Sequence, residues 1–409
     1  MLKILILIGG HLCSAPRAQK EARVLANAGY DVIIGGFWFE PVFIERDRLL
    51  LTNQKFRFNA IVDFQPNRRF TNYWIRLQTR IAKEIFRRFG VFLPELLSYG
   101  TRAMLKYAQE VSADITIVHS EGGMWVGKQL LDRGFNVGVD FEDWFSEDLL
   151  PNARIDRPID ILKSLENQLI NECKYCLTTS HSLAEALAKA YQVPKPTAIY
   201  NSFPWSERSQ IDAQIRDRQN LDLASIHWFS QTIGQGRGLE VLFQSLPYIN
   251  KSVEIHLRGN YPEVSRQWLE SQVPPECRDR LFIHPTVPND ELLSRIAEHD
   301  IGLALECNSI SSRNLTITNK FFQYLQAGLA IVATNTEGQY EILSQYPEIG
   351  ELIPSNDFMA LAEAINSLID NMQKLKHRQK AALEAAQEKL NWENQEDTIL
   401  KLIEKAISK

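Results

Sequence analysis

The chain of 409 residues is poor in cysteine, and it has no apolar run long enough to span a membrane. Its five cysteines, an odd number, argue against a disulfide framework and for a reducing compartment. No apolar run reaches the ~18 residues that a membrane span needs. The apolar stretch at residues 2–10 has a single basic residue, Lys3, and lacks the pattern of a signal peptide. It predicts a buried first β-strand, and we expect a cytoplasmic protein.

The sequence also lacks an excess of charge of either sign. Lys and Arg together number 45 and Asp and Glu 50, which gives a net charge of −5 and no reason to expect nucleic-acid binding. A hydrophobic fraction of 44% excludes a disordered chain, and 20 Gly and 17 Pro exclude collagen-like and Pro-rich classes. The remaining class is globular, and the length predicts two or three domains.

Short apolar runs alternate with amphipathic stretches along the chain. One series covers residues 3–8, 31–35, 114–119, 136–140, 175–179 and 197–200, and a second covers 225–229, 253–258, 281–284, 300–305, 329–333 and 350–353. Runs rich in Ile, Val and Leu are typical of strands buried on both faces of a parallel sheet. The intervening stretches 17–29, 239–250 and 318–328 have helical spacing. This alternation predicts an α/β fold of doubly wound parallel sheets.

The two series are separated by residues 202–224, which have no apolar period. We therefore expect an N-terminal domain at 1–203, a linker at 204–224, a C-terminal domain at 225–385 and a C-terminal helix at 386–409. Ligands in such folds bind at the carboxyl ends of the strands. The expected architecture is two Rossmann-like domains that face an interdomain cleft.

A glycine-rich turn follows the first strand of the second series. It contains Gly234, Gly236, Arg237 and Gly238 and opens a helix. Such glycines let backbone N–H groups approach an anion, and Arg237 adds a charge that suits a phosphate. The alternative is an ordinary strand–helix turn, because the third glycine lies too close for a dinucleotide fingerprint.

Lys320 is a second candidate for binding an anion. It falls in the first turn of the helix predicted at 318–328, where a lysine opposes the helix dipole unless an anion lies nearby. Asn319 is a candidate cap of this helix. The alternative is an ordinary amphipathic helix with a solvated lysine. His256 and His284 fall within predicted strands, and we expect them in the core.

An ordered set of motifs resembles the retaining GT-B glycosyltransferases of the family 4 type, from about Lys3 to Asp370. The N-terminal motifs are Pro16-Arg17 with Lys20-Glu21-Ala22, the strand end at His119, the segment 178–184 and Tyr200-Asn201. The C-terminal motifs are Arg237-Gly238-Leu239-Glu240 and Asn319-Lys320-Phe321-Phe322-Gln323-Tyr324 with Ala327-Gly328.

The resemblance implies transfer of a sugar, with retention of configuration, from a nucleotide-sugar to a saccharide or lipid-linked acceptor, as in polysaccharide biosynthesis. It places the donor in the C-terminal domain and the acceptor in the N-terminal one. Arg237 and Lys320 would hold the diphosphate and stabilise the leaving group. The other donor-binding residues would be Gly234, Gly236, Gly238, Asn319 and Gln323. No metal and no cofactor besides the donor is implied, and the nearest approach to an Asp-x-Asp pair is Asp140-Phe141-Glu142.

Four residues of the N-terminal half are candidates for the same site. His119 ends a predicted strand and Glu121 follows it, while Arg17 opens the first helix. We group Glu142 and His119 with Arg237 and Lys320 as candidate catalytic residues, and place Arg17 and Glu121 on the acceptor side. For His119 the alternative is a buried structural histidine.

Three positions depart from the pattern of the resembled family. Leu315 and Gln323 stand where the family often has two glutamates eight residues apart, and Glu142 stands where many members have a histidine. Gln323 still accepts a hydrogen bond, without charge assistance. Glu142 could contact donor hydroxyls or act as a base. These departures keep open a non-catalytic sugar-nucleotide-binding or partner subunit, and a sugar-nucleotide epimerase shares the fold.

The segment from Asn67 to Gly90 is strongly basic. At helical spacing Trp74, Leu77, Ile81 and Ile85 form one stripe, and Arg76, Arg80, Lys83 and Arg87 form another. A basic amphipathic helix with a tryptophan suits an anionic membrane surface. We expect that this segment can place the protein peripherally on the inner face of a membrane. The alternative is a surface helix packed on its own domain.

Overall fold

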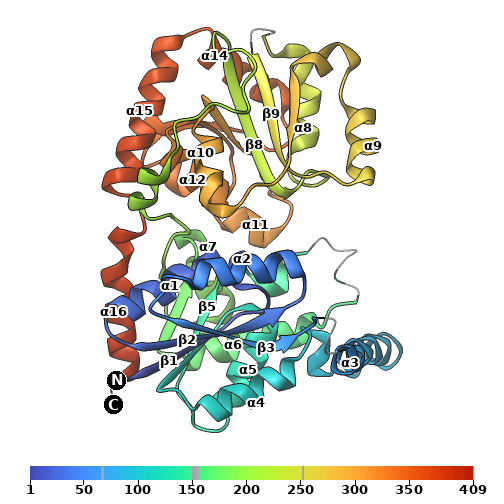
Figure 1. Cartoon of the computed structure of the whole chain (residues 1–409), viewed down its shortest axis with the longest axis vertical. Coiled ribbons are helices and arrows are strands. Elements are labelled where there is room, and N and C mark those ends of the chain that lie inside the picture. Colours follow the sequence, from blue (N-terminus) through green and yellow to red (C-terminus); the bar gives the residue numbers. More distant parts are fainter. Residues whose placement is uncertain (66–68, 150–153, 155, 251–252, 409) are drawn as a thin grey trace. The chain divides into compact units, whose positions relative to one another are not determined.

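The computed structural model describes residues 1–65, 69–149, 154, 156–250 and 253–408. The chain forms two compact units. The first comprises Met1–Thr179, Leu183–Ile199 and Gln395–Lys409, and the second comprises Ser180–Ser182 and Tyr200–Asn394. Each unit contains one parallel sheet with helices packed against it, so the predicted α/β fold class is confirmed (Figure 1).

The sheet of the first unit has seven strands in the order β3-β2-β1-β4-β5-β6-β7, and every pairing is parallel. The strands are β1 (Lys3–Leu7), β2 (Asp31–Trp38), β3 (Arg57–Asp63), β4 (Ile115–Val118), β5 (Val137–Phe141), β6 (Tyr175–Thr178) and β7 (Thr197–Ala198). Strand β3 was not predicted. It lies at the sheet edge, and its first four residues alternate exposed with half-buried positions, so it lacks the continuous apolar run on which the other predictions rested.

Helices lie on both faces of this sheet, with α1 and α2 on one side and α4 and α5 on the other (Figure 1). The helices of this part of the chain are α1 (Pro16–Asn27), α2 (Pro41–Leu51), α3 (Arg69–Phe89), α4 (Thr101–Val111), α5 (Ser120–Leu131), α6 (Ile159–Glu172), α7 (His181–Tyr191) and α16 (Glu393–Ile407). Strand β1 is buried on both faces, since Ile4, Leu5, Ile6 and Leu7 have no exposed surface. This burial agrees with the predicted first strand.

The sheet of the second unit has six strands in the order β10-β9-β8-β11-β12-β13, again all parallel. The strands are β8 (Ala224–Thr232), β9 (Val253–Asn260), β10 (Leu281–His284), β11 (Ile301–Ala304), β12 (Ala330–Thr334) and β13 (Gly350–Ile353). The strand order reverses between β8 and β11. In open α/β sheets such a switch point is where ligands bind, at the carboxyl ends of the strands.

The helices of the second unit are α8 (Leu239–Ser245), α9 (Glu263–Gln272), α10 (Asn289–Ile296), α11 (Ser311–Leu315), α12 (Asn319–Ala327), α13 (Glu337–Leu343), α14 (Phe358–Ile369) and α15 (Met372–Glu388). Helix α12 ends at Gly328, whose φ of 84° is left-handed and suits glycine. The ring of Tyr324 packs directly on Gly302 of β11, where a Cβ atom would overlap it. This close approach packs the second half of α12 directly on β11.

Residues 211–222, within the predicted linker, are held against the second unit by polar contacts. Asp212 accepts two hydrogen bonds of 2.7 Å from Arg295, and Arg218 pairs with Asp300 at 3.1 Å. The backbone N–H groups of Asp217 and Asn220 donate to Glu298 and Glu254 at 2.7 and 2.8 Å. Polar anchoring explains why this segment has no apolar period.

Candidate active site

A pocket of about 170 Å³ lies at the carboxyl ends of four strands of the second unit. Its walls are Gly236, Gly238, Glu240 and Val241 after β8, Leu305, Glu306 and Cys307 after β11, Thr334 at the end of β12, and Ile353, Pro354 and Asn356 at the end of β13. Two walls come from β8 and β11, so the pocket lies at the switch point of the sheet. This is where the glycine-rich turn was expected to bind an anion.

The glycine-rich turn depends on its glycines for shape. Gly236 and Gly238 have φ values of 73° and 80°, and a Cβ on Gly238 would overlap Leu305. The Gly236 N–H donates to the Glu240 carboxylate at 2.6 Å, so this amide already binds an anionic group of the chain. The side chain of Arg237 is exposed, and within the described residues it forms no ion pair. Gly234 is half-buried, outside the pocket lining.

Lys320 is buried, with 6% of its surface exposed, and not solvated as the alternative had it. Its ammonium donates to Glu306 Oε1 at 2.9 Å and lies 5.6 Å from the centre of the Trp228 ring. The residue occupies the first turn of α12, as predicted. Glu306 was missed, although it directly follows the apolar run at 300–305. Its position directly after a predicted strand is the feature of the sequence that could have identified it.

The remaining donor-side predictions have mixed outcomes. Asn319 is exposed at the start of α12, and the N-cap position belongs to Thr318, so the prediction that Asn319 caps the helix is wrong. Gln323 is half-buried, and within the described residues its side chain has no hydrogen bond. Leu315, at one of the two positions where the family often has glutamate, is buried. Neither Leu315 nor Gln323 therefore supplies the carboxylate that the family often has at these two positions.

In the first unit His119, at the carboxyl end of β4, links the carboxylate of Glu142, which follows β5, to that of Glu21 in α1. Its ring contacts Glu142 Oε1 through Nδ1 at 2.7 Å and Glu21 Oε2 through Nε2 at 3.0 Å. Burial would lower the pKa of His119, but the hydrogen bonds and charges of Glu142 and Glu21 outweigh it and raise the pKa to about 10. His119 is therefore an imidazolium at neutral pH and donates both protons.

Glu142 is the more accessible partner of this imidazolium. Its side chain is 34% exposed, whereas those of His119 and Glu21 are 3% and 1% exposed. Burial acts to raise the pKa of Glu142, but the hydrogen bond and charge of His119 with the charge of Arg17 lower it. Glu142 is thus an ionised carboxylate held by a buried cation. Sequence reasoning named His119 and Glu142 but missed the role of Glu21, which also accepts from the Tyr175 hydroxyl.

The two residues expected on the acceptor side are tied to other groups. Arg17 is buried and donates to Asp140 Oδ2 and the Ile199 carbonyl at 2.6 Å and to the Thr178 carbonyl at 3.2 Å. These contacts join α1 to the ends of three strands. Glu121 forms an ion pair with Arg157. Both residues therefore have structural contacts in this state, and a direct role toward an acceptor stays a prediction.

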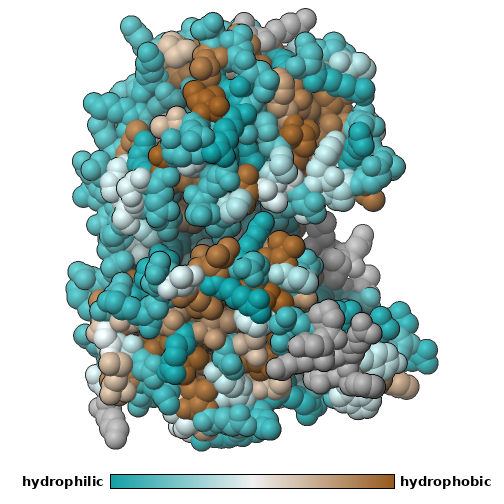
Figure 2. All heavy atoms as spheres, viewed as in Figure 1, coloured by the Kyte–Doolittle hydropathy of each residue, from teal (hydrophilic) through white to brown (hydrophobic). Residues whose placement is uncertain are grey.

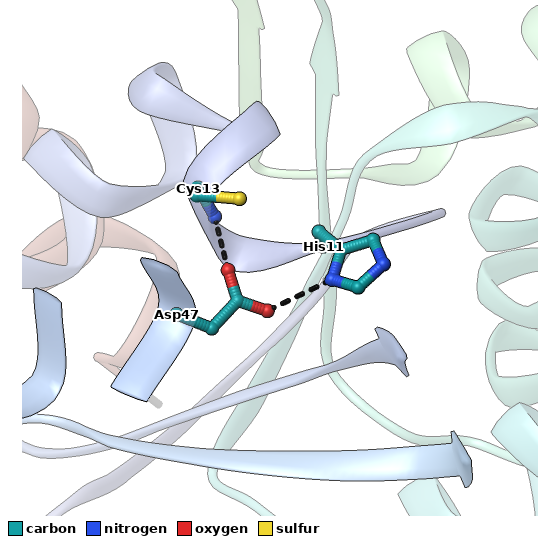
Figure 3. A group of neighbouring side chains, drawn as sticks. All are labelled: His11, Cys13 and Asp47. Atoms are coloured by element: carbon teal, nitrogen blue, oxygen red, sulfur yellow. Dashed lines mark hydrogen bonds and ion pairs between the residues drawn. The ribbon is translucent and has the colours of Figure 1, made fainter. Parts of the chain in front are cut away.

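Two groups of metal-ligand types occur among the described residues, and hydrogen bonds engage both. In the first, His11 Nδ1 lies 3.1 Å from Asp47, which also accepts from the Cys13 N–H at 2.7 Å (Figure 3). The other ring nitrogen of His11 accepts from the Phe39 N–H at 2.9 Å, so Nδ1 carries the proton. The second group contains Glu21, His119 and Asp140, and its histidine is the protonated imidazolium. Neither histidine offers a free lone pair in this state.

Helix α3 carries the predicted basic amphipathic pattern. Asn72, Thr79 and Ala82 are buried, whereas Trp74 and Ile81 of the apolar stripe are 59% and 45% exposed. Basic residues cover much of the rest, and the part of α3 visible in Figure 2 is mainly hydrophilic. Asn67 and Arg68 lie outside the described residues. Among the described residues, none of the helices has the length and apolarity to span a bilayer.

Sequence comparison places the pocket-bearing unit in a family. Residues 226–371 match the model of the glycosyl transferases group 1. This segment belongs to the group 1 glycosyltransferases. The match spans the glycine-rich turn, Glu306 and Lys320, so all three are parts of a group 1 segment. No curated protein matches the chain.

Solved structures of similar fold cover almost the whole chain. Anabaena Alr3699/HepE in complex with UDP-glucose has a TM-score of 0.70 at 16% identity and covers 99% of this chain and 100% of that chain. Sucrose-phosphate synthase (tll1590) from Thermosynechococcus elongatus has a TM-score of 0.69 at 14% identity, with 99% of each chain covered. A Listeria monocytogenes protein described as a UDP-N-acetylglucosamine 2-epimerase has a TM-score of 0.59 at 10% identity. The match covers 98% of this chain and 96% of that chain. At these identities the likeness shows the GT-B fold and no activity.

Proposed function

We propose that the protein is a glycosyltransferase that moves a sugar from a nucleotide-sugar donor to a saccharide or lipid-linked acceptor, with retention of configuration and without a metal. The observation that carries the proposal is the buried Lys320, which is bonded to Glu306 in the wall of a pocket that the glycine-rich turn also lines, at the switch point of a group 1 segment. UDP-glucose in the HepE structure makes UDP-glucose the first donor to test. The proposed bounds remain 1–203 for the acceptor domain and 225–385 for the donor domain.

The donor diphosphate is assigned to Lys320, Arg237 and the N–H groups of the turn. Breaking the bond between the sugar and the diphosphate leaves negative charge on the leaving oxygen, and fixed cations stabilise that charge. Lys320 is held in one place by Glu306, whereas the exposed Arg237 is free to move onto a ligand. Asn319 and Gln323 are proposed to orient the donor from the first two turns of α12.

Glu142 is proposed to act on the acceptor hydroxyl, with His119 as a positioning residue. His119 is already protonated, so it cannot accept a proton. The ionised Glu142 carboxylate can accept the proton of the hydroxyl while the new bond to the sugar forms. A binding role toward donor hydroxyls is the second use of the same carboxylate. Both roles need the carboxylate to stay charged, which His119 secures.

Product analysis separates this proposal from its rivals. The full chain is incubated with UDP-glucose, alone and with a panel of saccharide and lipid-linked acceptors, and UDP and products are measured. A transferase releases UDP in step with glycosylated acceptor, and the anomer of the product reports retention. Conversion of the UDP-sugar without an acceptor indicates the epimerase. Binding without consumption of any donor indicates a non-catalytic subunit.

We also propose that α3 contacts an anionic membrane surface, which would place a cytoplasmic protein peripherally on the membrane. Trp74 and Ile81 leave apolar surface exposed beside the basic stripe, and Tyr73 and Phe89 are 68% and 73% exposed. Of this stripe Trp74 and Ile81 are exposed and Leu77 and Ile85 are half-buried, so α3 does not bury the stripe as a helix packed on its own domain would. Apolar and cationic side chains together suit the interface of an anionic bilayer.

A further inference from the structure

The pocket of the second unit carries two carboxylates whose oxygens differ in what they contact. Glu240 accepts a hydrogen bond from the Gly236 N–H, and Glu306 accepts one from Lys320. Both line the pocket. Within the described residues the lining includes no Lys or Arg, so the walls themselves offer a diphosphate no cation. The pocket is built to receive hydrogen-bond donors.

Glu306 is fixed at both its backbone and its side chain. Its N–H donates to Thr334 Oγ1 at 3.0 Å, which ties the end of β11 to the end of β12. Its Oε1 accepts from Lys320, and the two side chains are 15% and 8% exposed. Among the described residues, no group donates to Oε2. A preorganised carboxylate with an unused oxygen in a pocket is an acceptor for ligand hydroxyls.

Electrostatics decides which part of a nucleotide-sugar can lie there. A diphosphate placed against Glu306 would meet a like charge, whereas a hydroxyl pair would donate to it through charge-assisted hydrogen bonds. Acidic side chains that bind ribose hydroxyls beside a phosphate-binding turn follow the same logic. Among the described residues Lys320 donates a hydrogen bond to Glu306 alone, so its other ammonium protons are available to phosphate oxygens.

We infer that Glu306 binds a hydroxyl pair of the donor and so supplies the carboxylate that Leu315 and Gln323 lack. The inference rests on the proposed function. Gln323 lies three residues after Lys320, on the same side of α12. A carboxylate at position 323 would therefore approach the same region from the helix, whereas Glu306 approaches it from the strand. The hydroxyl pair belongs either to the ribose or to the transferred sugar.

The test compares ligands that differ by one hydroxyl. Dissociation constants for UDP, 2′-deoxy-UDP, 3′-deoxy-UDP and UDP-glucose are measured by calorimetry on the full chain and on Glu306→Gln. In the natural chain, loss of a bound ribose hydroxyl is expected to weaken binding about tenfold to a hundredfold. In Glu306→Gln the ratio of the deoxy-UDP dissociation constant to the UDP dissociation constant is expected to fall at least fivefold. If the transferred sugar is the partner, the ratio of UDP-glucose to UDP changes instead.

Two further variants keep the result interpretable. Glu306→Gln/Gln323→Glu returns a carboxylate to the region and is expected to recover part of the lost discrimination. Glu263→Gln removes an exposed carboxylate of the same unit and is expected to leave all ratios unchanged. Equal ratios in the natural chain and in Glu306→Gln overturn the inference, whatever the absolute affinities. Failure of the natural chain to bind UDP-, GDP- or ADP-type ligands overturns the proposed function itself.

Discussion

His119 of the first unit and a group of four histidines of the second unit are in opposite charge states. In the first unit His119 lies between the carboxylates of Glu21 and Glu142, and its pKa is raised to about 10. In the second unit His227, His256, His284 and His299 lie together on one side of the sheet, and burial lowers the pKa of each of them. The same side chain is thus a cation at neutral pH in His119 and a neutral ring in the four histidines of the second unit.

The registers of the strands explain the histidine layer of the second unit. His227 of β8 is paired with His256 of β9, and the rings of His227 and His299 stack at 4.6 Å. Two carboxylates contact the layer. Asp217 pairs with Arg258 and lies 3.4 Å from His284 and 3.8 Å from His299, and Glu254 lies 3.2 Å from His256. Each carboxylate also has an arginine partner, Arg258 for Asp217 and Arg218 for Glu254. Burial lowers the pKa of each of these histidines, whereas at His119 the two directly bonded carboxylates outweigh burial.

The largest expected effect concerns the charged His119 of the first unit and the carboxylate that it holds. Glu142→Gln removes the base held by His119, and it is expected to slow transfer by about 10²–10⁴-fold with nucleotide affinity near that of the natural chain. Steady-state kinetics and calorimetry measure the two quantities. Glu110→Gln, on the exposed face of α4, is the control. If the protein only binds sugar nucleotides, no donor is consumed by any variant, and Glu142→Gln tightens nucleotide binding by removing repulsion.

Lys320 is a buried cation of the second unit, and its removal is expected to have the next largest effect. Lys320→Ala and Arg237→Ala are each expected to weaken nucleotide diphosphate binding about tenfold to a hundredfold and to slow transfer about 10²–10³-fold. The double variant is expected to lose less than the sum, because both residues contact one group. Lys380→Ala, an exposed lysine on α15, is the matched control. Unchanged affinity in both single variants would refute the placement of the donor.

The two histidine environments predict stability losses at opposite ends of the pH scale. The folded pKa of His119 is above the unfolded value of about 6.5, so its contribution is complete below that pH and is lost as the pH rises toward 10. The folded pKa of His256 is lowered to about 2, so its contribution is present above about 6.5 and is lost as the pH falls. Urea unfolding between pH 5 and 10 measures both.

Variants show which histidine causes each part of the pH dependence of stability. His119→Gln is expected to flatten the alkaline limb, by up to a few kcal/mol, and to leave the slope between pH 5 and 6.5 unchanged. An alkaline slope that persists in this variant would show that other groups cause it. His119→Gln is also expected to lower kcat more than it changes the nucleotide affinity, because it loosens Glu142 without touching the donor pocket.

A smaller effect is expected from His227, whose two ring nitrogens are buried without a hydrogen-bond partner in the described residues. His227→Phe replaces an unsatisfied polar ring with an apolar one. It is expected to leave stability at pH 7 unchanged or raised by about 1 kcal/mol, and to reduce the loss between pH 6.5 and 5. His377→Gln, an exposed histidine on α15, serves as control. A strong destabilisation by His227→Phe would show that this histidine has a partner or a steric role.

The smallest expected effect is weak, salt-sensitive binding of the first unit to vesicles through α3. Each Lys or Arg near an anionic surface contributes about 1 kcal/mol, and salt screens it. Sedimentation with anionic and neutral vesicles, at low and high salt, measures the binding. Trp74→Ser with Arg80→Gln is expected to reduce it several-fold, and Lys106→Gln on α4 is the control. Equal binding to both vesicle types, or none, would remove the membrane role.

The sequence was sufficient for features that depend on local pattern. Buried strands show as continuous apolar runs, so both sheets were predicted apart from the alternating edge strand β3. Lys320 was identified because a lysine in a first helical turn needs an explanation, and His119 because it ends a predicted strand. Glu142 was identified because many members of the resembled family have a histidine at its position. His256 was expected in the core and is fully buried, while His284 is half-buried.

Contacts between residues that are far apart in the sequence could not be predicted from the sequence alone. Glu21 and His119 are 98 positions apart, and Glu306 and Lys320 are joined only because α12 packs on β11. The charge of a buried histidine likewise depends on which carboxylates the fold brings to it. Residue type and spacing therefore indicated where the site residues are, and the three-dimensional contacts indicate what each can do.

The chain passes from the first unit to the second near residue 200 and returns near residue 394. The second unit is therefore an insertion within the first in terms of connectivity. Helix α16 completes the first unit, where Ile399 and Ile403 are fully buried and the Ala406 carbonyl accepts from Asn136 at 3.0 Å. A chimera that exchanges donor units between relatives accordingly needs two junctions, and a deletion at the C-terminal end damages the unit that begins the chain.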